Sequence, residues 1–419
     1  MAVHRAPSSE DGEDEIEEAV FLDGDDVIQE VYVDEEVLPR YLTSGSSHSL
    51  RFTLDLPDVD DDGNNGLLTE PDRLVTFETE AIDDAVHVFT GHSDSVFAVT
   101  CNSARERLVA SGGGDNKAFL WTIGEGYSPI ELKGHTDSVA ALAFSSDGQI
   151  LASGGLDGIV NTWDTSSGGL RQKFEGPSEA IEWIKWHPRG HVLLAGSEDF
   201  TAWMWNADTA ACMAVFSGHS ASVTCGDFTP DGKIVCTGSA DASLRIWNPK
   251  SGESIYVIQG HPYHTEGVTC LSISRDSHIA LTGSTDKSAC IVNIQSGKVV
   301  GSLVEHSDSV ECVGLSASLP LAATAGMDGK LLIWDLQTLS SRSTCQHEDG
   351  VVNLIWSTSS ELIYTGCLDG KVRVWDGRTG SCEKILSGHE DSILDIAITQ
   401  DEKYILSGSD DYTVRVFEI

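Results

Sequence analysis

The chain has 419 residues, of which 26 are Lys or Arg and 66 are Asp or Glu, so its formal net charge is −40. Such a charge repels nucleic-acid phosphates and anionic membrane surfaces, and it favours a basic protein or peptide as partner. No apolar run is long enough to span a membrane, and the N-terminal stretch MAVHRAPSSEDGEDEIEE lacks the apolar core of a signal peptide.

The ten cysteines lie mostly inside apolar runs, and no two form a C-x-x-C pair. This spacing is typical of reduced, buried thiols rather than of disulfides or a zinc site. We therefore expect a monomeric cytoplasmic protein, with a nuclear location left open, that has no metal, no cofactor, no direct nucleic-acid contact and no membrane insertion.

Residues 1–80 differ in composition from the rest of the chain. They contain 23 acidic residues, four arginines and no lysine, a net charge of −19, which leaves −40 + 19 = −21 for residues 81–419. Such a segment buries too little apolar surface to offset its chain entropy, so we expect an acidic, mostly disordered tail. Two apolar patches within it, Ala19–Leu22 and Val27–Val33, are predicted to be short binding motifs or a strand added on binding.

One tail segment resembles a calcium-binding loop. Residues 58–70 match the first, third, fifth and sixth positions of an EF-hand loop, but the twelfth residue is Thr69 and prolines flank the segment. We interpret it as a solvated acidic linker and predict no metal site.

From residue 84 onward the chain repeats eight times, at intervals of 41, 42 or 45 residues. In each repeat a glycine-rich turn ends in an aspartate, and a Trp, or once Val292 and once Phe417, follows six residues later. A His precedes the aspartate by 22 to 25 residues in seven repeats. Alternating apolar runs between these anchors, such as SVAALAF and IVNTW, predict four short strands per repeat.

This period and these anchors are typical of WD40 repeats, and residues 84–419 resemble that family throughout. The resemblance implies an all-β, eight-bladed propeller in which each repeat buries a hydrogen-bonded set of His, Ser or Thr, Asp and Trp. Repeat 3 lacks the His and the hydroxyl, and we assign His261 as the histidine of repeat 5. Complete sets are His92, Ser111, Asp115 and Trp121; His135, Ser153, Asp157 and Trp163; His219, Thr237, Asp241 and Trp247; His306, Thr324, Asp328 and Trp334; and His347, Thr365, Asp369 and Trp375.

Two strands predict how the ring closes. Each repeat reads as one outer strand followed by three inner strands, so the eighth blade lacks an outer strand and the chain starts with a spare one, near Val86–Phe89. Pairing it with the last strand, near Thr413–Phe417, would remove the open edges. A seven-bladed ring with one stray repeat is the alternative.

The loop between the outer strand and the next inner strand carries a carboxylate in seven of eight repeats. The WD40 resemblance implies that these loops share the top face of the propeller, where a ring of like charge would attract basic ligands. Local capping of the loop is the alternative role. We predict a partner-binding face made of Asp94, Asp137, Glu179, Glu266, Asp308, Asp349 and Asp391, with Glu182, Glu198, Glu311 and Asp410 nearby and Trp183 as an aromatic contact for a cation. Burial of Trp183 between blades is the alternative.

Eight repeats, the acidic run FLDGDDVIQEVYVDEE and the repeat GHTDSVAALAFSSDGQILASGGLDG together resemble the angio-associated migratory cell protein family. The resemblance to its fungal relatives implies a non-catalytic chaperone that holds a basic large-subunit ribosomal protein before ribosome assembly. A WD40 scaffold in signalling or trafficking is the alternative, and nothing in the sequence selects for a ubiquitin-ligase receptor. We reject a hydrolase, because the same Ser or Thr, His and Asp recur five times where the family buries them.

Overall fold

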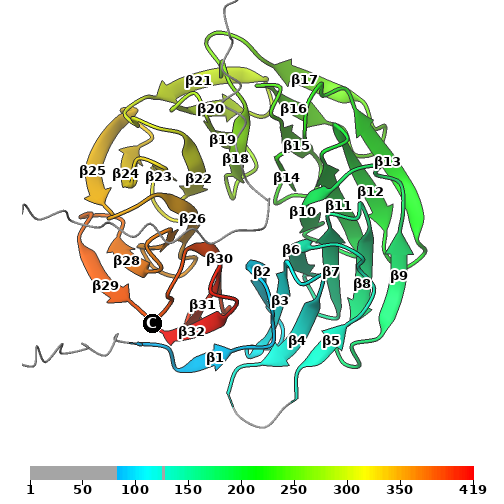
Figure 1. Ribbon diagram of the computed structural model, residues 1–419. Coiled ribbons are helices and arrows are strands. Elements are labelled where there is room, and N and C mark those ends of the chain that lie inside the picture. The colour runs from blue at the N-terminus through cyan, green and yellow to red at the C-terminus, as the bar shows by residue number, and fades with distance from the viewer. Residues whose placement is uncertain (1–82, 125–127) are drawn as a thin grey trace, which may run out of the picture. The chain divides into compact units, whose positions relative to one another are not determined.

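The computed structural model describes residues 83–124 and 128–419. The predicted tail, with its two apolar patches and the segment 58–70, lies outside the described residues. In the described part, 32 strands form eight four-stranded antiparallel sheets around a central opening (Figure 1). The eight-bladed propeller is therefore confirmed and the seven-bladed alternative is wrong. Within 83–124 and 128–419, no helix is long and apolar enough to cross a bilayer.

In the first seven blades, four consecutive strands pair from the central opening to the rim of the ring (Figure 1). Blades 1 to 4 consist of β2 (Val96–Cys101), β3 (Leu108–Gly113), β4 (Ala118–Thr122) and β5 (Ile130–Leu132); β6 (Val139–Phe144), β7 (Ile150–Gly155), β8 (Val160–Asp164) and β9 (Leu170–Phe174); β10 (Ile181–Trp186), β11 (Val192–Ser197), β12 (Thr201–Asn206) and β13 (Ala211–Ser217); and β14 (Cys225–Phe228), β15 (Val235–Gly238), β16 (Leu244–Trp247) and β17 (Ser254–Ile258). Blades 5 to 7 consist of β18 (Val268–Ile273), β19 (Ile279–Ser284), β20 (Ala289–Asn293) and β21 (Lys298–Leu303); β22 (Val310–Leu315), β23 (Leu321–Gly326), β24 (Lys330–Asp335) and β25 (Ser340–Gln346); and β26 (Val351–Trp356), β27 (Leu362–Cys367), β28 (Val372–Asp376) and β29 (Cys382–Leu386).

The eighth blade joins the two ends of the repeat region. Its strands run in the order β30 (Ile393–Ile398), β31 (Tyr404–Ser409), β32 (Val414–Glu418) and β1 (His87–Phe89). β1 pairs with β32 so that Val88 lies opposite Arg415. The predicted closure is confirmed, with each of the two strands starting one residue later than expected. All eight sheets are thereby completed, and the last blade gains the outer strand that its own repeat does not supply.

A carboxylate on an inner strand adds a second connection at this junction. Asp395 of β30 accepts hydrogen bonds from the Val99 backbone N–H of blade 1 at 2.8 Å and from the Asn353 side chain of blade 7 at 2.6 Å. Desolvation raises the pKa of Asp395 to about 7. The side chain therefore links three neighbouring inner strands around the central opening.

The predicted hydrogen-bond network forms in the second blade as expected. His135 Nδ1 lies 3.2 Å from Asp157, His135 Nε2 lies 2.8 Å from the Ser153 hydroxyl, and the Trp163 indole donates to the same hydroxyl at 2.9 Å. A neutral imidazole with its proton on Nδ1 satisfies all of these atoms. The corresponding sets of repeats 1, 4 and 6 have the same connectivity.

Repeat 7 departs from this pattern, so its network is only partly as predicted. His347 bonds to Thr365 at 2.9 Å, but the Arg373 guanidinium occupies the Asp369 carboxylate, with one N–O distance of 3.1 Å. Burial and the Arg373 charge lower the pKa of His347 to about 4. His347 Nδ1 has no hydrogen-bond partner among the described residues.

The assignment of His261 in repeat 5 is wrong, because the network histidine is His264. The His264 imidazole is buried, 2.9 Å from the Thr282 hydroxyl and 3.1 Å from Asp286, whereas His261 is exposed. Tyr263 donates to Thr282 at 3.0 Å and so replaces the missing Trp indole. The loop before β18 is longer than in other repeats, which places a different histidine at the network position.

Replacement of His264 with alanine is expected to lower the free energy of unfolding by about 2–4 kcal/mol, since it removes the buried hydrogen bonds of the imidazole to Thr282 and Asp286 and opens a cavity. His261→Ala is the matched control and should change stability by no more than about 0.5 kcal/mol. Urea unfolding followed by tryptophan fluorescence measures both values. Equal effects of the two substitutions would contradict the revised assignment.

Candidate functional site

The top face of the propeller is built from two kinds of loop. One kind joins the outermost strand of a blade to the innermost strand of the next, as in residues 133–138, and the other joins the second and third strands of a blade, as in residues 156–159. Hydrogen bonds tie the two kinds together, for example Leu156 N–H to the Ser138 carbonyl at 2.9 Å. Because the strands of every blade alternate in direction, all such loops lie at the same end of the sheets.

The structure places the seven predicted loop acids at equivalent positions just before an innermost strand. Asp94 is half-buried and the other six are exposed. Their equivalence by repeat distributes them around seven of the eight blades. In the eighth case, blade 4, the position holds Ala221. The top face therefore carries a nearly complete ring of carboxylates.

Local capping also takes place in this ring. Five of these aspartates accept a hydrogen bond from the backbone N–H of the next residue, at 2.7 to 2.9 Å. Each bond uses only Oδ1, so one carboxylate oxygen is left for other partners. The capping alternative is confirmed for the five aspartates Asp94, Asp137, Asp308, Asp349 and Asp391, and it leaves their negative charge on the surface.

Blade 3 brings two further predicted acids together. Glu182 is the second residue of β10 and Glu198 follows β11, and their side chains share a hydrogen bond. Desolvation, together with the hydrogen bond and the charge of Glu198, raises the pKa of Glu182 to about 7. Two neighbouring carboxyl groups repel each other when both are ionised, so a cation placed beside them would stabilise the pair.

A second group of acids lies at the junction of blades 8 and 1. Asp410 follows β31, and its pKa is raised by desolvation and by the charges of Asp391, Asp94 and Asp411.

The remaining predicted acid, Glu311, lies on β22 of blade 6 and accepts a hydrogen bond from the Ser309 hydroxyl at 2.5 Å. The top face thus combines the ring of loop acids with four further acids, Glu182, Glu198, Glu311 and Asp410.

None of the eleven predicted acids lies within 4 Å of a Lys, Arg or His nitrogen of the described residues. Three cations of the top-face loops bind other groups: Lys371 lies 2.7 Å from Glu348, Arg373 binds Asp369, and Lys287 donates to the Ser307 carbonyl at 3.1 Å. A surface with this excess of uncompensated carboxylates has a strongly negative potential. The eleven acids are Asp94, Asp137, Glu179, Glu182, Glu198, Glu266, Asp308, Glu311, Asp349, Asp391 and Asp410.

The predicted role of Trp183 as an exposed contact for a cation is wrong. Trp183 is only 9% exposed, and its indole N–H donates to the Val223 carbonyl of the next blade at 2.8 Å. Its ring lies against Gly196 and Gly226, where an added Cβ would collide with it. The alternative of burial between blades is confirmed, since Gly226 leaves a space that Val, Leu or Ile fills in most other blades.

Two exposed aromatic side chains of the top face were not predicted. Phe200 and Tyr412 are 46% and 48% exposed and follow the turn aspartates Asp199 and Asp411. Both have a positive φ, a region that bulky residues seldom occupy. The sequence contains a signal that could have found them. Three other repeats have Gly at this position, which indicates a positive φ, so an aromatic residue at the same position is unusual.

The hydroxyl, His and Asp groups inside the blades resemble a nucleophilic triad in connectivity but not in access. The hydroxyl residues Ser111, Ser153, Thr237, Thr324 and Thr365 are all 0% exposed, and each accepts an indole N–H. A substrate could reach such a hydroxyl only after the blade opened. These groups therefore stabilise the blades and offer no reactive surface.

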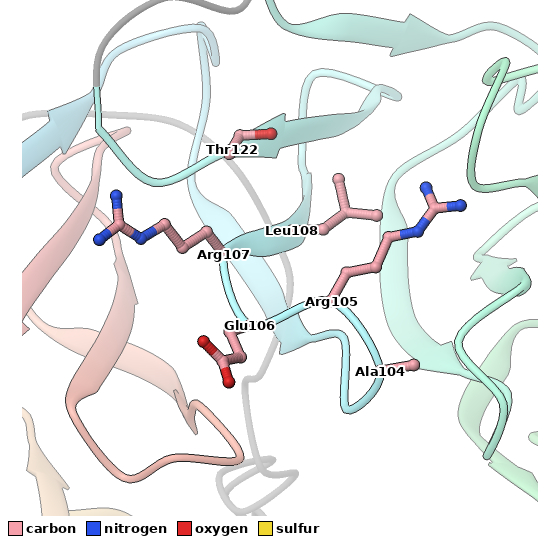
Figure 2. A pocket seen from close by; sticks show the side chains of 6 residues that line it. All are labelled: Ala104, Arg105, Glu106, Arg107, Leu108 and Thr122. Carbon is pink, nitrogen blue, oxygen red and sulfur yellow. The ribbon is translucent and has the colours of Figure 1, made fainter.

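Two hollows of the described surface are lined by residues other than the acids of the carboxylate ring. One of about 500 Å³ is lined by the turn between β2 and β3, and Figure 2 shows Arg105 and Arg107 extending in opposite directions from it. Side chains that diverge in this way do not converge on a bound group. Another, of about 390 Å³, includes Lys185, Trp186 and Asp227 on inner strands. The charged ring of the top face is the more extensive feature.

A family model described as "WD domain, G-beta repeat" matches eight segments of the chain, residues 84–122, 126–164, 168–206, 210–248, 252–293, 297–335, 339–376 and 380–418. The chain belongs to the WD40 repeat family. Each matched segment starts near an outermost strand and ends near the third strand of the following blade, so the WD40 repeat is offset by one strand from the blade.

Curated relatives within the WD40 family match a short part of the chain. The angio-associated migratory cell protein of Homo sapiens is 38% identical over 85 residues, which is 20% of each chain. An uncharacterized WD repeat-containing protein of Schizosaccharomyces pombe is 39% identical over 79 residues, 19% of this chain and 20% of its own. Ribosome assembly protein 4 of Chaetomium thermophilum is 30% identical over 83 residues, 20% of this chain and 16% of its own. The matches span about a fifth or less of these relatives.

Solved structures share the fold over nearly the whole propeller. Sqt1 of Chaetomium thermophilum has a TM-score of 0.75 and 24% sequence identity, covering 81% of this chain and all of the Sqt1 chain. A second structure with the same values contains Sqt1 bound to the N-terminus of the ribosomal protein L10. Sqt1 of Saccharomyces cerevisiae has a TM-score of 0.73 at 24% identity.

Proposed function

We propose that this WD40 propeller is a non-catalytic escort of a basic ribosomal protein, which it holds on its top face before large-subunit assembly. The observation that carries the proposal is the set of eleven top-face carboxylates, seven of them in the ring, with no Lys, Arg or His nitrogen within 4 Å among the described residues. Lys and Arg residues of the client that are paired with these carboxylates would be unable to bind RNA, and the client would be kept from aggregating. We propose further that it acts as a cytoplasmic monomer.

Two other observations support a binding role rather than catalysis. The hydroxyl groups that neighbour His and Asp are buried inside the blades. Sqt1, which has the same fold, has been captured with the N-terminus of a ribosomal protein. A basic N-terminal segment is therefore the client chemistry that we propose for the present chain.

Binding of a Lys- and Arg-rich peptide to the full chain tests the proposal. Fluorescence anisotropy should give an affinity that falls about tenfold or more between about 50 mM and 500 mM salt, because salt screens exposed charges. The triple variant Asp94→Asn, Asp391→Asn and Asp410→Asn should weaken binding about tenfold at low salt, since it removes one group of acids.

A matched control removes the same charge from other surfaces. Glu106→Gln, Glu253→Gln and Glu383→Gln replace exposed acids outside the top face. We expect this variant to bind the peptide within about twofold of the wild type, because none of the changed sites lies in a top-face loop and salt screens charges at a distance. Equal weakening by both triple variants would show attraction by net charge alone and would contradict a top-face site.

The pKa of Glu182, raised to about 7, predicts a pH dependence of binding. As the pH rises from about 6 to about 8, Glu182 ionises and the affinity for the basic peptide should rise by a few-fold. Stability should change in the opposite sense, because a carboxyl group with a raised pKa costs free energy once it ionises. Glu182→Gln should reduce both dependences in titrations of binding and of urea unfolding; unchanged pH profiles would contradict the assignment.

A signalling or trafficking scaffold is the second candidate, and apolar side chains on the outermost strands favour it. Met213 and Val215 on β13, Ile255 and Val257 on β17, and Val300 on β21 are all exposed. Partners of such a scaffold would bind through apolar contacts that salt does not weaken. Affinity capture from lysate at low and high salt separates the two functions: a ribosomal protein lost at high salt supports the escort, and salt-resistant signalling proteins support the scaffold.

A further inference from the structure

The residue after the turn aspartate has the same backbone conformation in all eight blades. Its φ lies between 62° and 73° in every case, in the left-handed region. Glycine occupies this region freely, whereas a residue with a large side chain is strained there. The eight residues are Asn116, Gly158, Phe200, Ala242, Lys287, Gly329, Gly370 and Tyr412.

Phe200 and Tyr412 do not offset this strain by burial. About half of each side chain is exposed to solvent, so neither ring fills a core. Asn116 and Lys287, by contrast, use their side chains to bind carbonyl groups of the next blade, at Thr136 and Ser307. Two aromatic rings held in a strained conformation at the surface indicate a contact made outside this chain.

Tyr412 lies at the edge of the acidic group of blades 8 and 1. It directly follows Asp410 and Asp411, and Asp410 interacts electrostatically with Asp391 and Asp94. These carboxylates have no Lys or Arg within 4 Å among the described residues. An aromatic face and unpaired carboxylates therefore border the same part of the top face.

Phe200 combines the same two features in blade 3. It follows Glu198 and Asp199, and Glu198 forms the pair with Glu182 described above. Its turn is tied to the loop of blade 4 by the hydrogen bond from Val223 N–H to the Ser197 carbonyl at 3.1 Å. That loop contains Ala221, the single position of the ring without a carboxylate, so Phe200 is placed where the acidic ring is interrupted.

Such a combination distinguishes arginine from lysine. A guanidinium group is planar, so it stacks on an aromatic ring while its N–H groups bind a carboxylate in its own plane. An ammonium group is compact and strongly hydrated, and it gains much less from the ring. Carboxylates alone attract both cations about equally.

We propose that Phe200 and Tyr412 are specificity residues of the top face, each stacking on an arginine of the bound polypeptide. This inference rests on the proposed function, because it names which basic residues that partner must present. The two rings lie on blades 3 and 8, so one extended segment that crosses the central opening would present both arginines.

Two synthetic peptides of equal length and charge test the inference on the full chain. One carries arginines separated by glycine and serine, and its twin has lysine at every arginine. Fluorescence anisotropy should show that the wild type binds the arginine peptide about tenfold more tightly, as expected for two stacking contacts. Phe200→Gly with Tyr412→Gly should reduce this preference to about twofold or less, while Phe200→Tyr with Tyr412→Phe should preserve it.

Strain gives an independent readout in the same variants. Because glycine adopts a positive φ without strain, the double glycine variant should have a melting temperature equal to or above that of the wild type. Ala242→Gly relieves the same strain in blade 4 without removing a ring, and it should keep the arginine preference. A structural role of the rings would instead lower the melting temperature and leave the preference intact.

The outcomes separate this inference from the proposed function. Equal binding of the two peptides by the wild type would overturn the arginine specificity and leave the escort function standing. An arginine preference that survives the double glycine variant would also overturn it. Failure of both peptides to bind at low salt would overturn the escort function together with this inference.

Discussion

Removal of residues 414–419 is expected to abolish the cooperative unfolding transition of the propeller. This deletion takes away β32, which pairs with β31 on one side and β1 on the other. Val414, Val416 and Phe417 are all 0% exposed, and burial of each such side chain contributes about 1.5–3 kcal/mol. Together with the lost strand pairing, the cost reaches the total stability of an ordinary domain, about 5–15 kcal/mol. Urea unfolding followed by tryptophan fluorescence measures the change.

Single substitutions provide the graded controls for this deletion. Phe417→Ala should cost about 3–5 kcal/mol, because a buried ring leaves a cavity. Val304→Ala, at a side chain that is 68% exposed, should change stability by no more than about 0.5 kcal/mol. A truncated chain that unfolds at the urea midpoint of the wild type would show that β32 does not close the ring.

Replacement of Trp183 with alanine is expected to lower the free energy of unfolding by about 3–5 kcal/mol. The indole fills the space between Gly196 and Gly226 and connects blades 3 and 4 through Val223. Because the ring is buried, the affinity of the folded variant for a basic peptide should stay within about twofold of the wild type. Thermal unfolding and anisotropy, measured under conditions in which the variant is folded, give the two values.

Trp183→Phe is the matched variant, since it keeps much of the ring and removes only the indole N–H. It should cost less than the alanine variant, on the order of 1–3 kcal/mol, as expected for a loss of ring volume and one buried hydrogen bond. If Trp183→Ala instead preserved stability and weakened peptide binding, the result would show that Trp183 contacts the peptide on the top face.

Repeat spacing explains why so much of this fold could be predicted. Eight aspartates at nearly constant intervals mark eight turns, and the alternating apolar runs between them mark the strands. A closed ring follows because β1 at one end of the repeat region can complete only the blade at the other end. The WD40 resemblance placed the loop acids on the top face, and the repeat explains why they share one face, since equivalent positions of a repeat occupy equivalent positions in space.

The errors arose where a repeat departs from the common pattern. The extra residues before β18 move the network position from His261 to His264, and spacing alone could not show which imidazole enters the blade. In repeat 7 the Arg373 guanidinium reaches Asp369 in place of His347, a competition between two side chains that the repeat pattern does not contain. The orientation of Trp183 depends on Gly226, which belongs to another blade and lies 43 positions away in the sequence.

The sequence by itself determined the number of blades, the closure of the ring and the face on which the acids gather, because each depends only on periodicity and strand direction. Tertiary structure alone decided which of these acids lie close together, as Glu182 and Glu198 do, and which aromatic rings stay exposed, as Phe200 and Tyr412 do. Those properties depend on distances and on burial between neighbouring blades. Residues from different repeats set both, and no single repeat contains that information.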